Sequence, residues 1–372
     1  MKRLFLTGAL LAVFAIAVGY VPASSAPGSL SVVSSSVVAE FPSRLIFSIE
    51  AEGPSDIEDI RLHYQVDRMK HVPTTSEAWP SFSPGPAVAA SWTWDMRRAS
   101  LPPGTLLTYW WTVRDSDGVE VETIPKEVAF EDDRYQWRSL ESTDLTLYWY
   151  AGDDDFAATL MDICEEAIEA LAADVGTRVE RHIKVYIYAS ADDLRRAMVY
   201  PQEWTGGVAF TEYGIIAIGI GPADLEWGRR ALRHELTHLV VHAATFSPFG
   251  HLPTWLDEGL AMHNEGEEGV SATFEAILAD AVENDRLLTL RTLSGPFSAD
   301  PSNAYLSYAE SHSIVEYLLD EYGSEKMHEL LMTFKAGATI DHALESVYGV
   351  GLDRLNADWC VSLQQEYANA WT

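Results

Sequence analysis

The feature that most constrains the fold is a change of hydrophobic pattern along the chain. Between about residues 29 and 130, short runs rich in β-branched and aromatic residues alternate with Pro and Gly, which is typical of an all-β domain. After Asp224 the apolar residues recur instead at helical spacing. Two such patterns in one chain predict more than one domain. The β-like runs are 44–51, 57–66, 87–94, 106–113 and 119–130.

The chain has 372 residues, enough for two domains that each bury a core. We predict a multi-domain protein with an all-β sandwich over residues 27–135 and a mixed α+β domain over residues 138–372 that is largely helical at its C-terminus. The junction should lie between about residues 130 and 142, a polar stretch rich in Asp, Glu and Arg. The expected elements of the second domain are strands at 145–150, 183–188, 207–210 and 214–220, and a helix at 156–171.

The first residues have the pattern of a targeting segment. Lys2 and Arg3 supply a positive start, and residues 4–21 are uncharged and mostly apolar. Small residues at 23–26 offer cleavage sites, but an apolar run of this length is also close to a membrane span. We therefore expect residues 1–26 to be a signal peptide or an N-terminal membrane anchor. The protein would then be extracytoplasmic, either secreted or attached to the outer face of the membrane.

The charge balance excludes one class of partner. The chain carries 56 Asp and Glu against 25 Lys and Arg, a formal charge of −31, which repels the phosphate backbone of nucleic acids. The only cysteines are Cys164 and Cys360. They could form one bridge in an oxidising compartment or remain as two buried thiols.

One helical segment carries a pattern of metal-binding chemistry. The sequence H-E-L-T-H at residues 234–238 lies inside a helical run that starts near Asp224 and continues to about residue 244. Residues four apart lie on one face of a helix, so the imidazoles of His234 and His238 can bind one ion. Glu235 is rotated by about 100° from His234, where it can accept a proton from water at the metal. The pattern predicts two metal ligands and a general base.

A zinc hydrolase needs a third protein ligand and an open position for water. His242 lies about 12 Å along the helix axis from His234, too far to share a tetrahedral ion with it, so we interpret His242 as a core or surface residue. The segment 253–261, P-T-W-L-D-E-G-L-A, follows after a short loop and supplies two carboxylates, Asp257 and Glu258.

H-E-L-T-H followed by P-T-W-L-D-E-G-L-A resembles the gluzincin zinc metallopeptidases, and most closely the peptidase MA-like domains; the resemblance covers about residues 140–372. It implies that Glu258 is the third ligand of a Zn²⁺ cofactor and that the substrate is a peptide or protein. Asp257 points about 100° away from Glu258 and is expected to cap or to be solvated. A metzincin would need Gly at 241 and His at 244, where this chain has Val241 and Ala244.

Two further expectations come with this resemblance. Family peptidases share a sheet whose edge strand borders the cleft, and residues 207–210 are the candidate for that strand, which could hold an extended substrate. Many such enzymes also donate a hydrogen bond from Tyr or His to the developing oxyanion. Tyr308 is the candidate catalytic donor, and His312, one turn later on the same helix face, is the alternative.

The β-like domain carries a looser resemblance. The segment 101–105, L-P-P-G-T, leads into an aromatic run at 109–111, which is similar to fibronectin type III and related immunoglobulin-like domains. The sequence does not name a partner for this domain. A rival interpretation is a surface binding or adhesion protein with a structural or degenerate zinc site. The presence of Glu235 favours the exported peptidase, in which Glu235 activates water, because a structural site needs no base beside its ligands.

Overall fold

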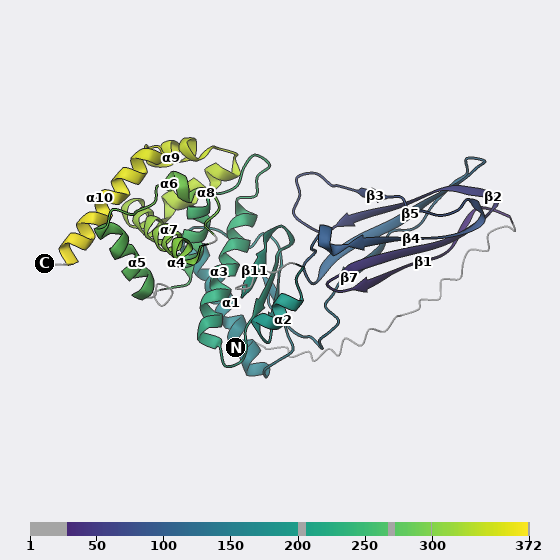
Figure 1. Cartoon of the computed structure of the whole chain (residues 1–372), viewed down its shortest axis with the longest axis horizontal. Coiled ribbons are helices and arrows are strands. Elements are labelled where there is room, and N and C mark those ends of the chain that lie inside the picture. The colour runs from purple at the N-terminus through teal and green to yellow at the C-terminus, as the bar shows by residue number, and fades with distance from the viewer. Residues whose placement is uncertain (1–27, 200–205, 267–271, 299, 371–372) are drawn as a thin grey trace. The chain divides into compact units, whose positions relative to one another are not determined.

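The computed structural model describes residues 28–199, 206–266, 272–298 and 300–370 (Figure 1). The chain divides into two compact units. The first contains the described residues up to Leu140 together with those of segments 148–150 and 190–206. The second contains the described residues of 141–147, 151–189 and 207–372. The expected targeting segment, residues 1–26, lies outside the described residues. The domain boundaries given above stay a prediction.

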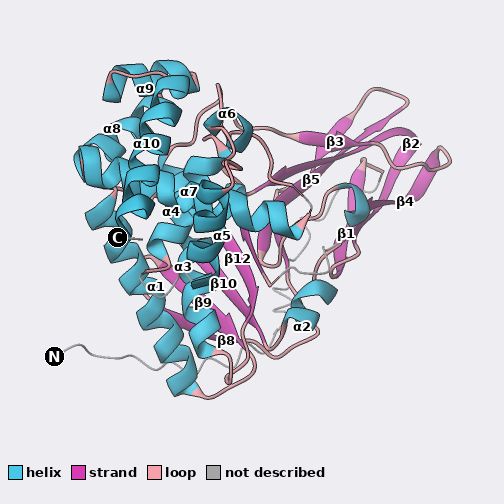
Figure 2. Ribbon diagram, turned by 60° about the vertical axis from the view of Figure 1, so that its left-hand side comes forward, coloured by secondary structure: helices cyan, strands magenta, loops and turns pink. Residues whose placement is uncertain are grey.

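The first unit is built on a seven-stranded sheet in which β2 is central. Its strand order is β1-β2-β5-β6, with β3 and β4 also paired to β2 and β7 paired to β5. Figure 2 draws the strands in magenta and labels β1 to β5. The strands are β1 (Ser31–Glu40), β2 (Arg44–Val66), β3 (Ser76–Ala78), β4 (Gly85–Asp95), β5 (Thr105–Asp115), β6 (Glu120–Glu122) and β7 (Lys126–Phe130).

Strand β2 belongs to both layers of a sandwich. Its first half pairs with β1 and β4, its second half pairs with β3 and β5, and the register shifts between Glu52 and Ile57. Alternate residues of the first half are buried, and Phe47 meets Tyr109 of β5 edge to face at 5.2 Å. The predicted sandwich is therefore confirmed. The two runs expected at 44–51 and 57–66 are one continuous strand.

The segment expected to be a polar junction is packed. Asp132 is fully buried, and its carboxylate accepts hydrogen bonds from the guanidinium of Arg134 at 2.8 and 2.6 Å. The ring of Tyr135 stacks on Tyr150 at 4.1 Å and 5°, and the Trp137 indole donates to the Asp132 carbonyl at 2.7 Å. Aromatic and buried ionic contacts hold residues 132–137 in place.

The second sheet has the order β11-β12-β10-β9-β8. β10 and β12 run parallel and β11 pairs antiparallel with β12, which leaves β11 at the edge. All five residues of β12 are buried, as expected of a strand covered on both faces. The elements are β8 (Arg138–Glu141), β9 (Leu145–Trp149), β10 (Ile183–Tyr188), β11 (Gly207–Phe210) and β12 (Ile215–Gly219), with α1 (Asp154–Asp174) and α2 (Ala191–Arg196) between them.

Beyond β12 the described chain is helical, as predicted. Helix α4 packs along α7, and α3 packs against α1 and α4. Gly323 and Gly337, both with positive φ, follow the ends of α7 and α8. Both cysteines are free thiols, and Cys164 is buried. None of the helices in the described ranges has the length and apolarity that a bilayer crossing requires. The helices are α3 (Leu225–Ala244), α4 (Thr254–Asn264), α5 (Ala272–Glu283), α6 (Leu290–Leu293), α7 (Pro301–Tyr322), α8 (Ser324–Lys335), α9 (Ile340–Tyr348) and α10 (Leu352–Ala370).

Candidate metal centre and active site

Helix α3 presents two imidazoles on one face. His234 and His238 are one turn apart, and their side chains are 19% and 13% exposed. The opposite faces of α3 carry Leu232, Leu236 and Val240, which are buried in the core and fix the rotation of the helix. The two histidines therefore lie together on the face of α3 that is turned away from these core residues.

Helix α4 brings Glu258 to the two histidines. The next residue, Gly259, allows α4 to approach α7 closely, because a Cβ atom at this position would overlap the Ser311 carbonyl and lie 2.6 Å from a methyl of Val315. A side chain on residue 259 would push α4 away from α7 and displace Glu258. The glycine of the P-T-W-L-D-E-G-L-A segment is thus a packing requirement of the site.

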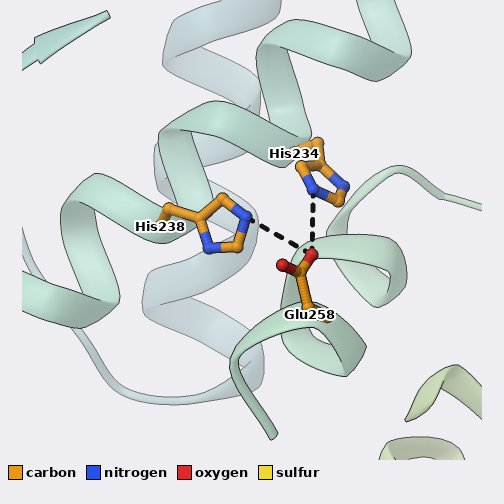
Figure 3. Close-up of side chains that lie close together, drawn as sticks. All are labelled: His234, His238 and Glu258. Carbon is orange, nitrogen blue, oxygen red and sulfur yellow. Dashed lines mark ion pairs between the residues drawn. The ribbon is translucent and has the colours of Figure 1, made fainter. Parts of the chain in front are cut away.

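The three candidate ligands converge on one point (Figure 3). Oε2 of Glu258 lies 3.4 Å from Nε2 of His234 and 3.6 Å from Nε2 of His238. This oxygen is buried and has no hydrogen-bond partner among the described residues. Two imidazole nitrogens and one carboxylate oxygen are a ligand set of catalytic zinc sites. The set fits a metal ion, since the Glu258 oxygen faces both imidazole nitrogens without a hydrogen bond to either.

A second layer of carboxylates orients the imidazoles. Nδ1 of His234 lies 2.9 Å from a Glu265 oxygen, and Nδ1 of His238 lies 3.0 Å from an Asp257 oxygen. Because an ionised carboxylate only accepts, each Nδ1–H donates and each Nε2 is left for a metal. The other oxygen of Asp257 lies 2.9 Å from Nε2 of His242. Asp257 therefore does not cap or solvate as expected from its helix position, because α4 turns it toward α3.

The charges of the site favour a cation between these groups. Burial lowers the pKa of His234, but the facing carboxylates of Glu258 and Glu265 outweigh it and raise the pKa to about 10. For His238, burial also opposes the positive charge, yet Asp257 raises the pKa overall. Burial acts to raise the pKa of Asp257, but the facing His238 holds it well below its ordinary value. The carboxylates around the two imidazoles therefore favour positive charge at this point.

Glu235 lies beside the ligands, against the edge strand β11. Burial raises the pKa of its carboxyl group, which His234, His238 and a hydrogen bond from the Ala209 backbone N–H oppose. An ideal Cβ on Gly207 would come within 2.9 Å of Oε1 of Glu235. Residues 207–210 thus form an edge strand at the site, at the position that the sequence indicated.

Tyr308 and His312 differ in what surrounds them. Burial raises the pKa of the Tyr308 phenol, and the charges of Glu258 and Glu235 raise it further, so Tyr308 faces the site and stays protonated. Nε2 of His312 instead lies 3.4 Å from Glu316, one turn further along α7. The structure brings Tyr308, and not His312, toward the candidate ligands.

This geometry defines a candidate metal centre on a helix-borne histidine pair. The chain belongs to the Peptidase MA superfamily, whose family model matches residues 163–365, more than half of the chain. No curated protein sequence matches it.

Solved structures show only distant likenesses. Aminopeptidase A of Legionella pneumophila, solved with aspartic acid, is similar over 90% of this chain and 50% of that chain, with 10% identity and a TM-score of 0.37. OgpA from Akkermansia muciniphila is similar over 28% of each chain, with 7% identity and a TM-score of 0.22. BhCBM56 is similar over 26% of this chain and 88% of that chain, with 10% identity and a TM-score of 0.19. This chain spans half or less of the first two proteins.

Four residues of the site were missed or misinterpreted in the sequence. Glu265 was not singled out, and Gly207 was expected only as part of the candidate edge strand. Asp257 and His242 were expected to be ordinary solvated or packed residues. The spacing of His238 and His242, a second four-residue step on α3, was the one available signal that His242 shares the helix face of the ligands.

Proposed function

We propose that this chain is an exported zinc-dependent peptidase that hydrolyses peptide bonds with water, with Glu235 as the general base. The observation that carries the proposal is the convergence of the buried Oε2 of Glu258 on the Nε2 atoms of His234 and His238, at 3.4 and 3.6 Å and without a hydrogen bond to either. Two imidazole nitrogens and a carboxylate oxygen that face one another in this way form a ligand set that suits zinc.

His234, His238 and Glu258 would hold the ion. Zinc there would act as a Lewis acid that polarises a carbonyl and lowers the pKa of water toward about 7. Glu265 and Asp257 would keep each imidazole in the tautomer that offers Nε2, since they accept from Nδ1–H. The same two carboxylates would increase the basicity of the ligands.

Glu235 would handle the proton. Its partly buried carboxyl group has a raised pKa, which makes it a stronger base than an exposed glutamate at the same pH. It would take a proton from the attacking water and return it to the leaving amine. The Ala209 N–H holds the carboxylate at the edge strand, close to where the backbone of an extended peptide would pair with β11.

Tyr308 would stabilise the oxyanion. Its phenol remains protonated because its pKa is raised, so it can donate a hydrogen bond without a change of charge. Such a donor acts where negative charge develops in the transition state.

The test of this proposal is Glu235→Gln, which preserves size and removes the base. The variant should keep about one zinc per chain, measured by metal analysis, and lose hydrolysis of a broad peptide library followed by mass spectrometry. Glu226→Gln, an exposed position on the same helix, is the matched control. An unchanged rate in Glu235→Gln would overturn the mechanism. If the parent and the variant both bound zinc but neither hydrolysed any peptide, the result would favour the rival interpretation of a surface binding or adhesion protein.

Export and the substrate are part of the proposal as well. We infer a secreted or surface-anchored location from the targeting pattern at residues 1–26. We infer a peptide or protein substrate from membership of the Peptidase MA superfamily. N-terminal sequencing of the protein recovered from culture medium and from membranes distinguishes a cleaved signal from a retained anchor.

A further inference from the structure

A cavity of about 440 Å³ lies among the helices of the second unit, within the size range of small-molecule sites, about 300–1,000 Å³. Its walls come from α4, α5, α7 and α10, which lie together in Figure 2. Met262 and Ala309 contribute to the wall. They lie one turn after Glu258 and one residue after Tyr308, so the helices that carry the candidate active site also shape this cavity.

The cavity is strongly acidic. None of the described residues that line it is Lys or Arg. Only one of its carboxylates, Glu316, has an ion pair among the described residues, to His263 and His312. Burial lowers the pKa of His312, so this lining residue adds little positive charge at neutral pH. Glu275, Asp320, Glu321 and Glu366 are exposed, so their charges create a negative potential where the hollow opens to solvent. The five acidic lining residues are Glu275, Glu316, Asp320, Glu321 and Glu366.

Aromatic rings share the same walls. Trp359 is buried, and its indole N–H donates to the hydroxyl of Ser313 at 3.1 Å, which fixes the ring. Burial raises the pKa of Tyr367, and the charges of Glu366 and Glu275 raise it further, so both carboxylates lie near this phenol. Aromatic faces attract cations, and a desolvated pair of this kind is stabilised more than an exposed one.

The negative charge and the aromatic rings of this cavity together indicate which class of ligand would bind there. Among the described residues, the groups close enough to bind a metal ion include no residue that lines this cavity. Its carboxylates are spread around apolar surface, including Leu278 and Met262. Such a surface suits a cation that carries a hydrocarbon stem. We propose that the cavity binds an organic cation, namely a guanidinium or primary ammonium group on an alkyl stem, as in Arg and Lys side chains or small diamines.

Calorimetric titration of the full chain with N-acetyl-arginine amide tests the proposal against N-acetyl-citrulline amide, which has nearly the same shape but no charge. The arginine compound should bind saturably and at least about tenfold more tightly than the citrulline compound, and the affinity should fall as salt is raised. A parallel titration with 1,4-diaminobutane distinguishes the sources. Tighter binding of the blocked amino acid indicates a peptide side chain, and tighter binding of the diamine indicates a free amine.

Variants locate the binding. Glu366→Gln and Glu275→Gln should each weaken the arginine compound by about threefold, and the double variant by about tenfold. Tyr317→Leu, which removes a partly exposed lining ring, should weaken it similarly. Glu283→Gln combined with Glu325→Gln removes the same charge from exposed positions outside the cavity and should leave binding unchanged.

Equal affinity for the citrulline compound, or an equal loss in the Glu283 and Glu325 control, would overturn the proposal. If Glu258→Gln lost binding of the arginine compound while the cavity variants kept it, the ligand would belong to the metal centre. That result would also overturn the proposal. The titrations need no turnover, so their outcome is independent of whether the chain hydrolyses peptides.

Discussion

Gly207 lies so close to Glu235 that a Cβ atom added to it would come within 2.9 Å of the Oε1 oxygen. The edge strand and the candidate base therefore fit together only when residue 207 has no side chain. Gly207 has no positive φ, so its role is space and not backbone conformation.

Gly207→Ala should displace the Glu235 carboxylate and lower kcat by about 10²-fold, the cost of a misplacement near 1 Å. Zinc content should not change, because the three ligands come from α3 and α4. Gly250→Ala, where an added Cβ meets nothing within 4 Å, is the matched control. Steady-state kinetics on any substrate found in the library screen measure the effect. Normal kcat in Gly207→Ala would show that Glu235 does not need this space.

Substitution of a metal ligand should reduce the zinc affinity more than substitution of a residue that only supports a ligand. Glu258→Ala should abolish tight zinc binding. Asp257→Asn should weaken it by about 10–100-fold, because Asp257 only orients His238. His242→Ala should have a smaller effect, since it acts through Asp257.

Competition with a zinc chelator measures the three affinities. His342→Ala, an exposed histidine on α9, is the control. If Asp257→Asn removed zinc as completely as Glu258→Ala, Asp257 would be a ligand and the third-ligand assignment would be wrong.

The sequence predicts those features of the site that one helix determines by itself. It does not predict those that depend on how two helices pack against each other. The four-residue step between His234 and His238 follows from helix geometry alone, so their convergence was predictable. The role of Asp257 depends on how α4 turns against α3, and no periodicity within either segment encodes that angle. Glu265 reaches His234 from the C-terminal end of α4 for the same reason.

The same contrast appears in the first unit. Strand-like alternation located β4 and β5, but it missed β1 and β3 and joined β6 to β7. Gly53 and Pro54 within residues 52–56 also indicated a break. The chain instead stays extended there and shifts register between the two layers. Which partner each half of β2 meets is a tertiary property that the local pattern does not contain.

Tyr308→Phe tests the oxyanion donor. Removing only the hydroxyl should lower kcat by about 10²–10³ with little change in KM, the expected effect of one lost donor. His312→Ala should retain kcat, because that imidazole faces Glu316. The reverse pattern, normal kcat in Tyr308→Phe and loss in a zinc-loaded His312→Ala, would transfer the role to His312.

Stability should depend on pH through Glu310. This side chain is fully buried on α7, accepts a hydrogen bond from the Leu288 N–H at 3.0 Å, and has a pKa raised by burial to about 8. A carboxyl group whose folded pKa exceeds its unfolded value of 4.5 contributes stability that is present below pH 4.5 and is lost as pH rises through 8. Thermal unfolding between pH 5 and pH 8.5 should show a falling Tm.

Glu310→Gln should flatten this fall, because the amide cannot ionise. Glu169→Gln, an exposed position on α1, should leave it unchanged. A slope that persists in Glu310→Gln would mean that other groups cause it.

The last prediction concerns where the chain can be divided. We predict that the β-sandwich and the peptidase domain fold separately, with the junction near residues 130–142. Tyr135 packs on Tyr150 at 4.1 Å and Trp137 meets the same ring at 5.0 Å; all three residues lie in the first compact unit, although Tyr150 follows the predicted junction in the sequence. A chain of residues 131–372 keeps both contacts, whereas a chain of residues 138–372 loses them.

Each aromatic pair contributes about 0.5–1.5 kcal/mol beyond area burial, and about 1 kcal/mol shifts Tm by roughly 2–4 °C in a domain of 150–250 residues. The shorter chain should therefore melt several degrees below the longer one while still binding zinc. Tyr135→Ala in the longer chain should reproduce part of that shift, because it removes the stacked ring and leaves Trp137. Equal melting of the two chains would show that residues 131–137 contribute nothing to the peptidase domain. Failure of both to fold or to bind zinc would show that the two domains share a core.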